Sequence, residues 1–105
     1  MTLTLILCLI PIRAQDKLLL AGSCNTSIMI VDKTSGSIEW QHTIEPYEKG
    51  IECNSVDITE DENILYSYKK GAKLININHK TIWNYQAPVG CEIHSACVLP
   101  DGGYL

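Results

Sequence analysis

Short segments in which apolar and polar residues alternate follow one another along most of the chain. Alternation with a period of two, bounded by turn-forming residues, is typical of β-strands with one buried face. No segment sustains the 3.6-residue apolar period of a helix, so we expect little helix. The strands predicted in this way span residues 18–23, 27–32, 37–42, 55–59, 63–68, 72–77 and 81–85. Tight polar turns between them predict an all-β fold of antiparallel meanders.

The predicted strands recur in a fixed order. Residues 50–56 match residues 90–96 at Gly, Glu and Ser, and Trp40 and Trp83 end two similar segments. A repeat of about 40–45 residues is the period of a four-stranded β-propeller blade. We therefore expect an incomplete β-propeller of about two blades over residues 15–105, with units at about 18–59 and 60–105, the second incomplete.

The N-terminal segment has the pattern of a targeting signal. Met1–Ile12 is apolar and uncharged, and it is too short to cross a membrane as a helix. A small residue, Ala14, follows at the position where signal peptides are cleaved. We expect residues 1–14 to be a secretory signal peptide, no transmembrane span after its cleavage, and a secreted or periplasmic protein. A buried first strand and a lipid-modified Cys24 are the alternatives.

Composition and charge narrow the classes of function. The chain is 46% hydrophobic and 19% charged, which excludes a disordered tail and a polytopic membrane protein. Its formal net charge is −4, so it lacks the basic surface that nucleic-acid binding requires. After cleavage four cysteines remain, and the sequence leaves open whether they are paired or free. These are Cys24, Cys53, Cys91 and Cys97.

Two strand-turn-strand segments carry a resemblance to a known family. Residues 28–40 and 73–83 each contain an apolar strand, a polar turn and a strand that ends in Trp, and Pro100-Asp101-Gly102 forms a further turn before an apolar strand. These segments resemble the quinoprotein-like (PQQ-like or WD40-like) β-propeller repeat of exported proteins. The resemblance implies that Trp40 and Trp83 pack between neighbouring blades. It also implies that the rest of the propeller lies in C-terminal sequence beyond Leu105.

The loop that enters the inner strand of each blade lies at the channel mouth in such a fold, where ligands bind. The candidate ligand-binding residues on this loop are Glu52, Asn54, Ser55, Glu92, His94 and Ser95. Period-two geometry places Glu52 and Asn54 on one side and Cys53 on the other. We expect an exported, non-catalytic scaffold that binds a protein, a glycan or a small polar ligand at its channel face. A structural role, in which Glu and Ser satisfy backbone groups between blades, is the alternative.

An enzyme is the second class of function that the resemblance raises. His94 would suit an arylsulfotransferase-like propeller, but no Arg follows Arg13 to activate an anion. A quinoprotein-like oxidoreductase would need an adjacent pair of cysteines, which is missing. The sequence therefore identifies neither catalytic residues nor a cofactor, and such residues would have to lie in missing blades.

Histidine and cysteine spacing gives no metal site. In an extended strand His94 faces away from both Cys91 and Cys97, so the three side chains cannot converge on one ion. His42 and His79 fall at strand ends or turns, where we expect solvated side chains.

Overall fold

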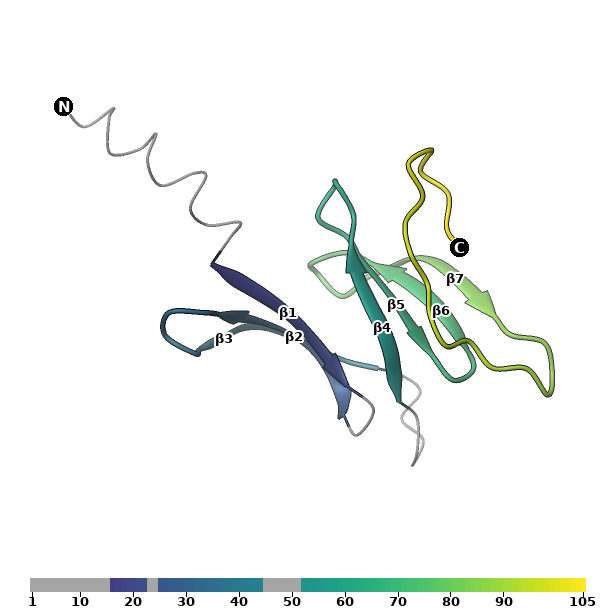
Figure 1. Cartoon of the computed structure of the whole chain (residues 1–105), viewed down its shortest axis with the longest axis horizontal. Helices are drawn as coiled ribbons and strands as arrows, with labels where there is room; N and C mark the ends of the chain where they lie inside the picture. Colours follow the sequence, from purple (N-terminus) through teal and green to yellow (C-terminus); the bar gives the residue numbers. More distant parts are fainter. Residues whose placement is uncertain (1–15, 23–24, 45–51) are drawn as a thin grey trace.

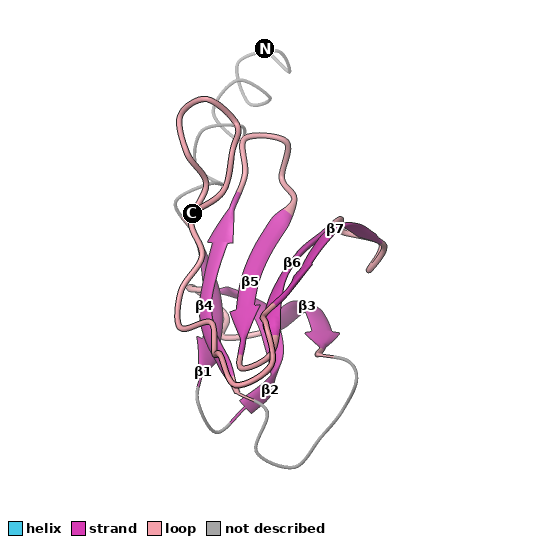
Figure 2. Cartoon of the chain, turned by 90° about the vertical axis from the view of Figure 1, so that its right-hand side faces the viewer, coloured by secondary structure: helices cyan, strands magenta, loops and turns pink. Residues whose placement is uncertain are grey.

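Two antiparallel β-sheets follow one another along the chain (Figure 1). The computed structural model describes residues 16–22, 25–44 and 52–105. The first sheet has the order β1-β2-β3, with β1 at Lys17–Gly22, β2 at Asn25–Asp32 and β3 at Ile38–Thr43. The second sheet has the order β4-β5-β6-β7, with β4 at Cys53–Ile58, β5 at Ile64–Tyr68, β6 at Gly71–Ile75 and β7 at Thr81–Gln86. Residues beyond β7 form loops that return along β4 (Figure 2).

The predicted all-β, antiparallel fold is confirmed, and all seven predicted strands coincide with observed ones within about two residues at each end. The strand predicted at residues 72–77 ends early, at Ile75, because the Asn76 side chain begins a turn. Its Oδ1 accepts hydrogen bonds from the backbone N–H of Asn78 (2.9 Å) and of Lys80 (3.0 Å). Within the described ranges no helix is long and apolar enough to cross a membrane. The predicted signal peptide and Cys24 lie outside those ranges.

The sequence repeat is also a repeat of hydrogen bonds. In the β4–β5 hairpin Ile58 pairs with Ile64, and the Thr59 N–H donates to the Asn63 carbonyl at 2.8 Å. Forty residues on, Val98 pairs with Tyr104, and the Leu99 N–H donates to the Gly103 carbonyl at 2.7 Å. Residues 91–105 therefore begin a third copy of the unit, after the two sheets.

The turn before the last strand of each sheet is repeated as well. The β2–β3 turn is closed by a hydrogen bond from Asp32 N to Ser37 O, and the β6–β7 turn by one from Asn76 N to Lys80 O, both 2.9 Å. In both turns the residue just before the one whose carbonyl accepts this hydrogen bond has a positive φ. It is Gly36 (φ 73°) in the first and His79 (φ 67°) in the second.

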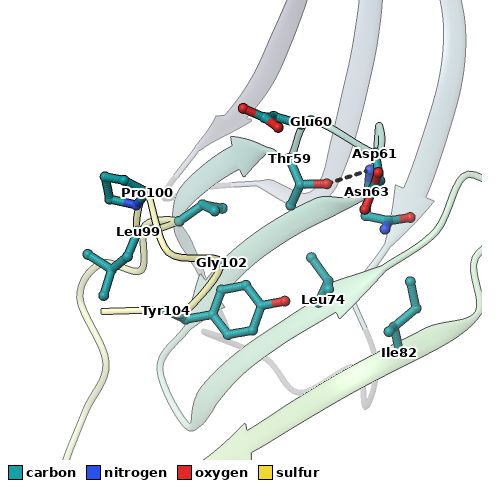
Figure 3. Close-up of a pocket in the computed structure, with 11 residues that line it drawn as sticks. Thr59, Glu60, Asp61, Asn63, Leu74, Ile82, Leu99, Pro100, Gly102 and Tyr104 are labelled. Carbon is teal, nitrogen blue, oxygen red and sulfur yellow. Dashed lines mark hydrogen bonds between the residues drawn. The ribbon is translucent and has the colours of Figure 1, made fainter.

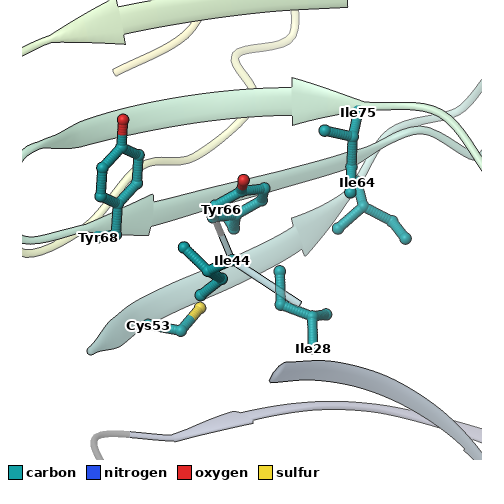
Figure 4. Packing of buried hydrophobic residues seen from close by; sticks show 7 residues of the cluster. All are labelled: Ile28, Ile44, Cys53, Ile64, Tyr66, Tyr68 and Ile75. Atoms are coloured by element: carbon teal, nitrogen blue, oxygen red, sulfur yellow. The ribbon is translucent and has the colours of Figure 1, made fainter. Parts of the chain in front are cut away.

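The central strands of the second sheet, β5 and β6, are buried on both faces. One face packs on the first sheet through Ile64, Tyr66, Tyr68 and Ile75, which meet Ile28 and Ile44 (Figure 4). On the other face Leu65, Ala72 and Leu74 meet Ala96 of the third unit. Every residue of β5 is therefore buried, which explains why it is a nearly continuous apolar run rather than an alternating one.

Candidate ligand-binding site

Four of the six candidate ligand-binding residues line one shallow pocket of about 220 Å³. Glu52 directly precedes β4 and Asn54 is its second residue, and Glu92 and His94 come from the equivalent positions of the third unit. Lys69, from the β5–β6 turn, completes the lining. Two consecutive copies of the repeat thus contribute to a single hollow.

Glu92 is the centre of the charge pattern in this pocket. Its Oε1 lies 3.4 Å from the Lys69 Nζ, and its Oε2 lies 3.7 Å from the His94 Nε2. Both pairs are largely exposed to solvent, so each contributes less than about 1 kcal/mol to stability. Among the described residues Glu52 forms no ion pair. The pocket therefore holds two carboxylates and one lysine.

Hydrogen bonds to the backbone of Ile93 hold the two halves of the pocket together. A bulge in β4 at Asn54 turns the side chain of Asn54 toward the third unit, where its Nδ2 donates to the Ile93 carbonyl at 2.9 Å. The Ile93 N–H donates in turn to the Lys69 carbonyl at 3.2 Å. Because Ile93 is fixed at both polar groups, Glu92 and His94 on either side of it are held at the pocket.

Ser55 lies outside the pocket, because the same bulge shifts the alternation of side chains along β4. Cys53 faces the first sheet, whereas Ser55 faces the third unit together with the buried Ser67. The Ser55 Oγ lies 2.7 Å from the Ser67 Oγ and accepts a hydrogen bond of 2.9 Å from the Ala96 N–H. Ser55 thus joins adjacent units, the structural alternative that the sequence left open.

Ser95 also lies outside the pocket. It lines a separate apolar hollow of about 230 Å³ together with Trp83 and Tyr104. The rings of Trp83 and Tyr104 are 4.8 Å apart between centroids. Ser95 is exposed, although it corresponds to Ser55 in the repeat.

Sequence reasoning missed Lys69. It precedes Lys70-Gly71 in a polar turn, and a lysine in a turn gives no signal beyond solvation. Only the tertiary contact between the β5–β6 turn and the third unit brings it to Glu92.

Trp40 packs against the core between the two sheets, and its Nε1 donates to the carbonyl of Ile77 in the β6–β7 turn at 2.8 Å. Trp83 packs against the core between the second sheet and the third unit. His79 is exposed and His42 half-buried, but the two histidines, expected only to be solvated, also contact each other. The Nδ1 atoms of His42 and His79 lie 3.0 Å apart, and both rings lie over Trp40.

The cysteines and histidines form no larger cluster. In the described ranges no group of three or more His, Cys, Asp or Glu residues is arranged to hold a metal ion. Cys53, Cys91 and Cys97 are free thiols, with Cys53 buried and the other two exposed. Burial raises the pKa of the Cys53 thiol to about 11, which makes it a poor nucleophile at neutral pH.

A larger hollow of about 360 Å³ lies where the turns of the second and third units meet (Figure 3). Leu74, Ile82 and Tyr104 supply its apolar lining, and the carboxylates of Glu60 and Asp61 lie at the β4–β5 turn beside it. None of the candidate residues from the sequence lines this hollow.

Comparisons with known proteins place the chain in a different family from the one that the sequence suggested. The family model described as "Mal s 1 allergenic protein-like" matches residues 22–104. A crystal structure of a protein of unknown function from Bacteroides caccae is similar, with 44% sequence identity and a TM-score of 0.75. That match covers 84% of this chain and 31% of the other, so the chain spans about a third of its structural relative. No curated protein matches.

The assignment to a quinoprotein-like, PQQ-like or WD40-like repeat family is therefore wrong, since the matching family model is another one and the comparisons give no support for a propeller family. The short strand-turn-strand segments on which the resemblance rested occur in many antiparallel sheets, so they do not distinguish these families. The match covers most of the residues that form the two sheets and the third unit. The chain belongs to the Mal s 1 allergenic protein-like family.

Proposed function

We propose that this chain is part of an exported, non-catalytic β-sheet scaffold that binds a polar ligand carrying a positive charge, on a peptide or a small molecule. The ligand site is the pocket of Glu52, Asn54, Glu92, His94 and Lys69. The proposal rests on one observation. Glu52 and Glu92, which occupy equivalent positions of two consecutive units, line one pocket that contains a single lysine, Lys69. Export is supported by the apolar stretch Met1–Ile12 and the small Ala14 after it.

The chemistry of the lining favours a cation. The Glu52 carboxylate has no cationic partner among the described residues, and the partners of Glu92 are one exposed lysine, Lys69, and His94. An ammonium or guanidinium group entering the pocket could donate hydrogen bonds to both carboxylates. Such charge-assisted hydrogen bonds are stronger than hydrogen bonds between neutral groups. The amide of Asn54 already donates to the Ile93 carbonyl, so its oxygen is left to orient a donor on the ligand.

The finer prediction about the fold, that each sheet is one blade of a ring of blades, belongs to this proposal. The repeated hairpin hydrogen bonds at Thr59 and Leu99 support it, as does the stacking of the second sheet between two neighbours. On the far side of the first sheet Leu18 and Leu20 are 42% and 40% exposed. An apolar face of this kind is expected of a unit that has another neighbour.

The experiment is a titration with a tetralysine peptide at low salt, followed by calorimetry, on the wild type and on Glu52→Gln, Glu92→Gln and Glu60→Gln. All three substitutions remove one negative charge, but Glu60 lies at the other hollow. We expect Glu52→Gln and Glu92→Gln to weaken binding about 2- to 5-fold each, since an exposed ion pair contributes roughly 0.5–1 kcal/mol. Glu60→Gln should leave the affinity nearly unchanged.

Equal weakening by all three variants would mean that the peptide responds to net charge alone, and the pocket would lose its role. Unchanged affinity in Glu52→Gln and Glu92→Gln would also reject the proposal. A tetraglutamate peptide serves as the probe of the opposite charge and should not bind.

A further inference from the structure

His42 and His79 form a contact between the two sheets that the proposed ligand site does not use. His42 lies on β3 of the first sheet, and His79 lies in the β6–β7 turn of the second. Their Nδ1 atoms are 3.0 Å apart, and their ring planes differ by 14°. The ring centroids are 5.2 Å apart, and this distance exceeds the distance between the two Nδ1 atoms by about two ring radii. The imidazoles therefore meet edge to edge, with the two Nδ1 atoms facing each other.

Trp40 forms one wall of this contact. Its ring lies 5.9 Å from that of His42 and 5.1 Å from that of His79, with planes inclined by 10° and 4°. The hydrogen bond from the Trp40 Nε1 to the Ile77 carbonyl fixes the indole against the second sheet. Both imidazoles are thus held over one rigid aromatic surface.

The backbone also holds each histidine in position. His42 pairs with Ile28 within the first sheet. The His79 N–H donates to the Asn76 carbonyl at 3.0 Å, and the Asn76 side chain closes the turn from the other side. Such support limits the entropy that the side chains lose when they bind a ligand together.

His79 lies in the β6–β7 turn at a position whose backbone conformation favours glycine. The equivalent position in the first sheet is Gly36, with φ 73°, and His79 has φ 67°. A non-glycine residue at positive φ is uncommon, although histidine is among the residues that adopt it more often. Backbone outliers of this kind cluster at functional sites, so the histidine side chain at this position suggests a use.

We propose that His42 and His79 form a two-histidine site for a borderline divalent transition-metal ion, of the class Zn²⁺, Ni²⁺ or Cu²⁺. Imidazole nitrogen is a preferred ligand of these ions. Two Zn–N bonds of about 2.0–2.1 Å at a tetrahedral angle place the nitrogens about 3.3 Å apart. The nitrogens therefore have to separate by about 0.3 Å, and the two rings have to tilt so that both Nδ1 lone pairs point at the ion. His79 is exposed, which leaves the remaining coordination positions to water. Coordination of the ion replaces the hydrogen bond between the two nitrogens and ties one sheet to the other.

Trp40 provides a reporter for the test. In the Trp83→Phe variant the emission comes from Trp40 alone, and Ni²⁺ bound at the histidines should quench it. Because thiolates bind the same ions, Cys8, Cys24, Cys91 and Cys97 are replaced by Ser in this background. Zn²⁺, which does not quench, should displace Ni²⁺ and restore the emission, whereas Mg²⁺, which prefers oxygen ligands, should not.

Three variants then decide the outcome. His79→Gly keeps the backbone conformation that Gly36 already adopts, so it removes the imidazole without unfolding the turn. We expect His79→Gly and His42→Gln each to weaken saturable Ni²⁺ quenching at least tenfold. His94→Gln removes an imidazole at the pocket with Glu92 and should leave the quenching unchanged.

Saturable quenching that persists in His79→Gly or in His42→Gln would overturn the proposal, as would its loss in His94→Gln. The absence of saturable quenching in the background protein would mean that the pair is a hydrogen bond between imidazoles and nothing more. Far-ultraviolet circular dichroism of each variant shows that a loss of quenching is not a loss of fold.

Discussion

The hydroxyl groups of Ser55 and Ser67 lie 2.7 Å apart across β4 and β5, and Ser67 is completely buried. The Ser55 oxygen also accepts the Ala96 N–H of the third unit at 2.9 Å. One hydroxyl therefore satisfies a buried side chain on its own sheet and a backbone donor of the next unit.

We expect Ser55→Ala to lower the free energy of unfolding by about 1–3 kcal/mol, because it leaves two polar groups without their partner. Ser95→Ala is the matched control, since Ser95 occupies the equivalent position but is exposed, and its effect should stay within about 0.5 kcal/mol. Urea unfolding of both variants measures the difference.

In a double-mutant cycle Ser55→Ala and Ser67→Ala should show a coupling above about 0.5 kcal/mol, and additive effects would contradict the shared network.

Local patterns predicted the strands well, because each strand and turn is encoded within a few residues. Asp32 and Asn76 both begin turns with side-chain oxygens that accept backbone N–H groups, and such residues are recognisable in a sequence. The repeat was visible for the same reason. It holds both in the sequence and in hydrogen bonds, as Ile64 and Tyr104 occupy equivalent hairpin positions.

Contacts between units were not predictable from these patterns. The bulge at Asn54 reverses the side on which Ser55 lies, and a period-two pattern assumes that no such irregularity occurs. Lys69 and His79 sit in turns whose sequences indicate only solvation, and each acquires its partner from another unit. The family was mistaken because strand-turn-strand segments report the local fold and carry little information about ancestry.

Gly71 begins β6, where the backbone of β7 lies close to it. A Cβ atom at this position would lie 2.1 Å from the Tyr85 carbonyl oxygen. We expect Gly71→Ala to lower the free energy of unfolding by about 1–3 kcal/mol, because two backbone segments have to separate. Gly22→Ala, where a Cβ meets nothing within 4 Å, should change it by less than about 0.5 kcal/mol. Thermal unfolding compares the two, and an equally stable Gly71→Ala variant would contradict the close approach of β6 and β7.

The three described thiols should react at very different rates. Cys91 and Cys97 are exposed, whereas Cys53 is 3% exposed and burial raises its pKa to about 11. In a background with Cys8 and Cys24 replaced by Ser, we expect two thiols to react rapidly with a chromogenic disulfide reagent at pH 8. The third should react only in denaturant, since a buried, protonated thiol is neither accessible nor nucleophilic. Rapid reaction of all three in the native protein would show that the core between the two sheets opens readily.

Asp32 should make the stability of the first sheet depend on pH. Its carboxylate accepts hydrogen bonds from the Ser35 and Thr34 N–H groups and pairs with the Lys17 Nζ at 3.0 Å. The Ser35 N–H first, and then Lys17, lower its pKa from 3.8 to about 2. A group whose pKa is lower in the folded state stabilises that state above the unfolded-state pKa, and this contribution is lost as the pH falls through the folded-state value.

The stabilisation by Asp32 is therefore present in full above about pH 4 and lost toward pH 2. Asp32→Asn isolates the effect, because its amide oxygen can still accept the turn hydrogen bonds, as Asn76 does in the second sheet. We expect the wild type to be more stable than Asp32→Asn at pH 7, and the difference to vanish as the pH approaches 2. Urea midpoints at pH 7, 5, 3.5 and 2 measure it. A difference that stays constant over this range would show that the carboxylate has no lowered pKa in the folded protein.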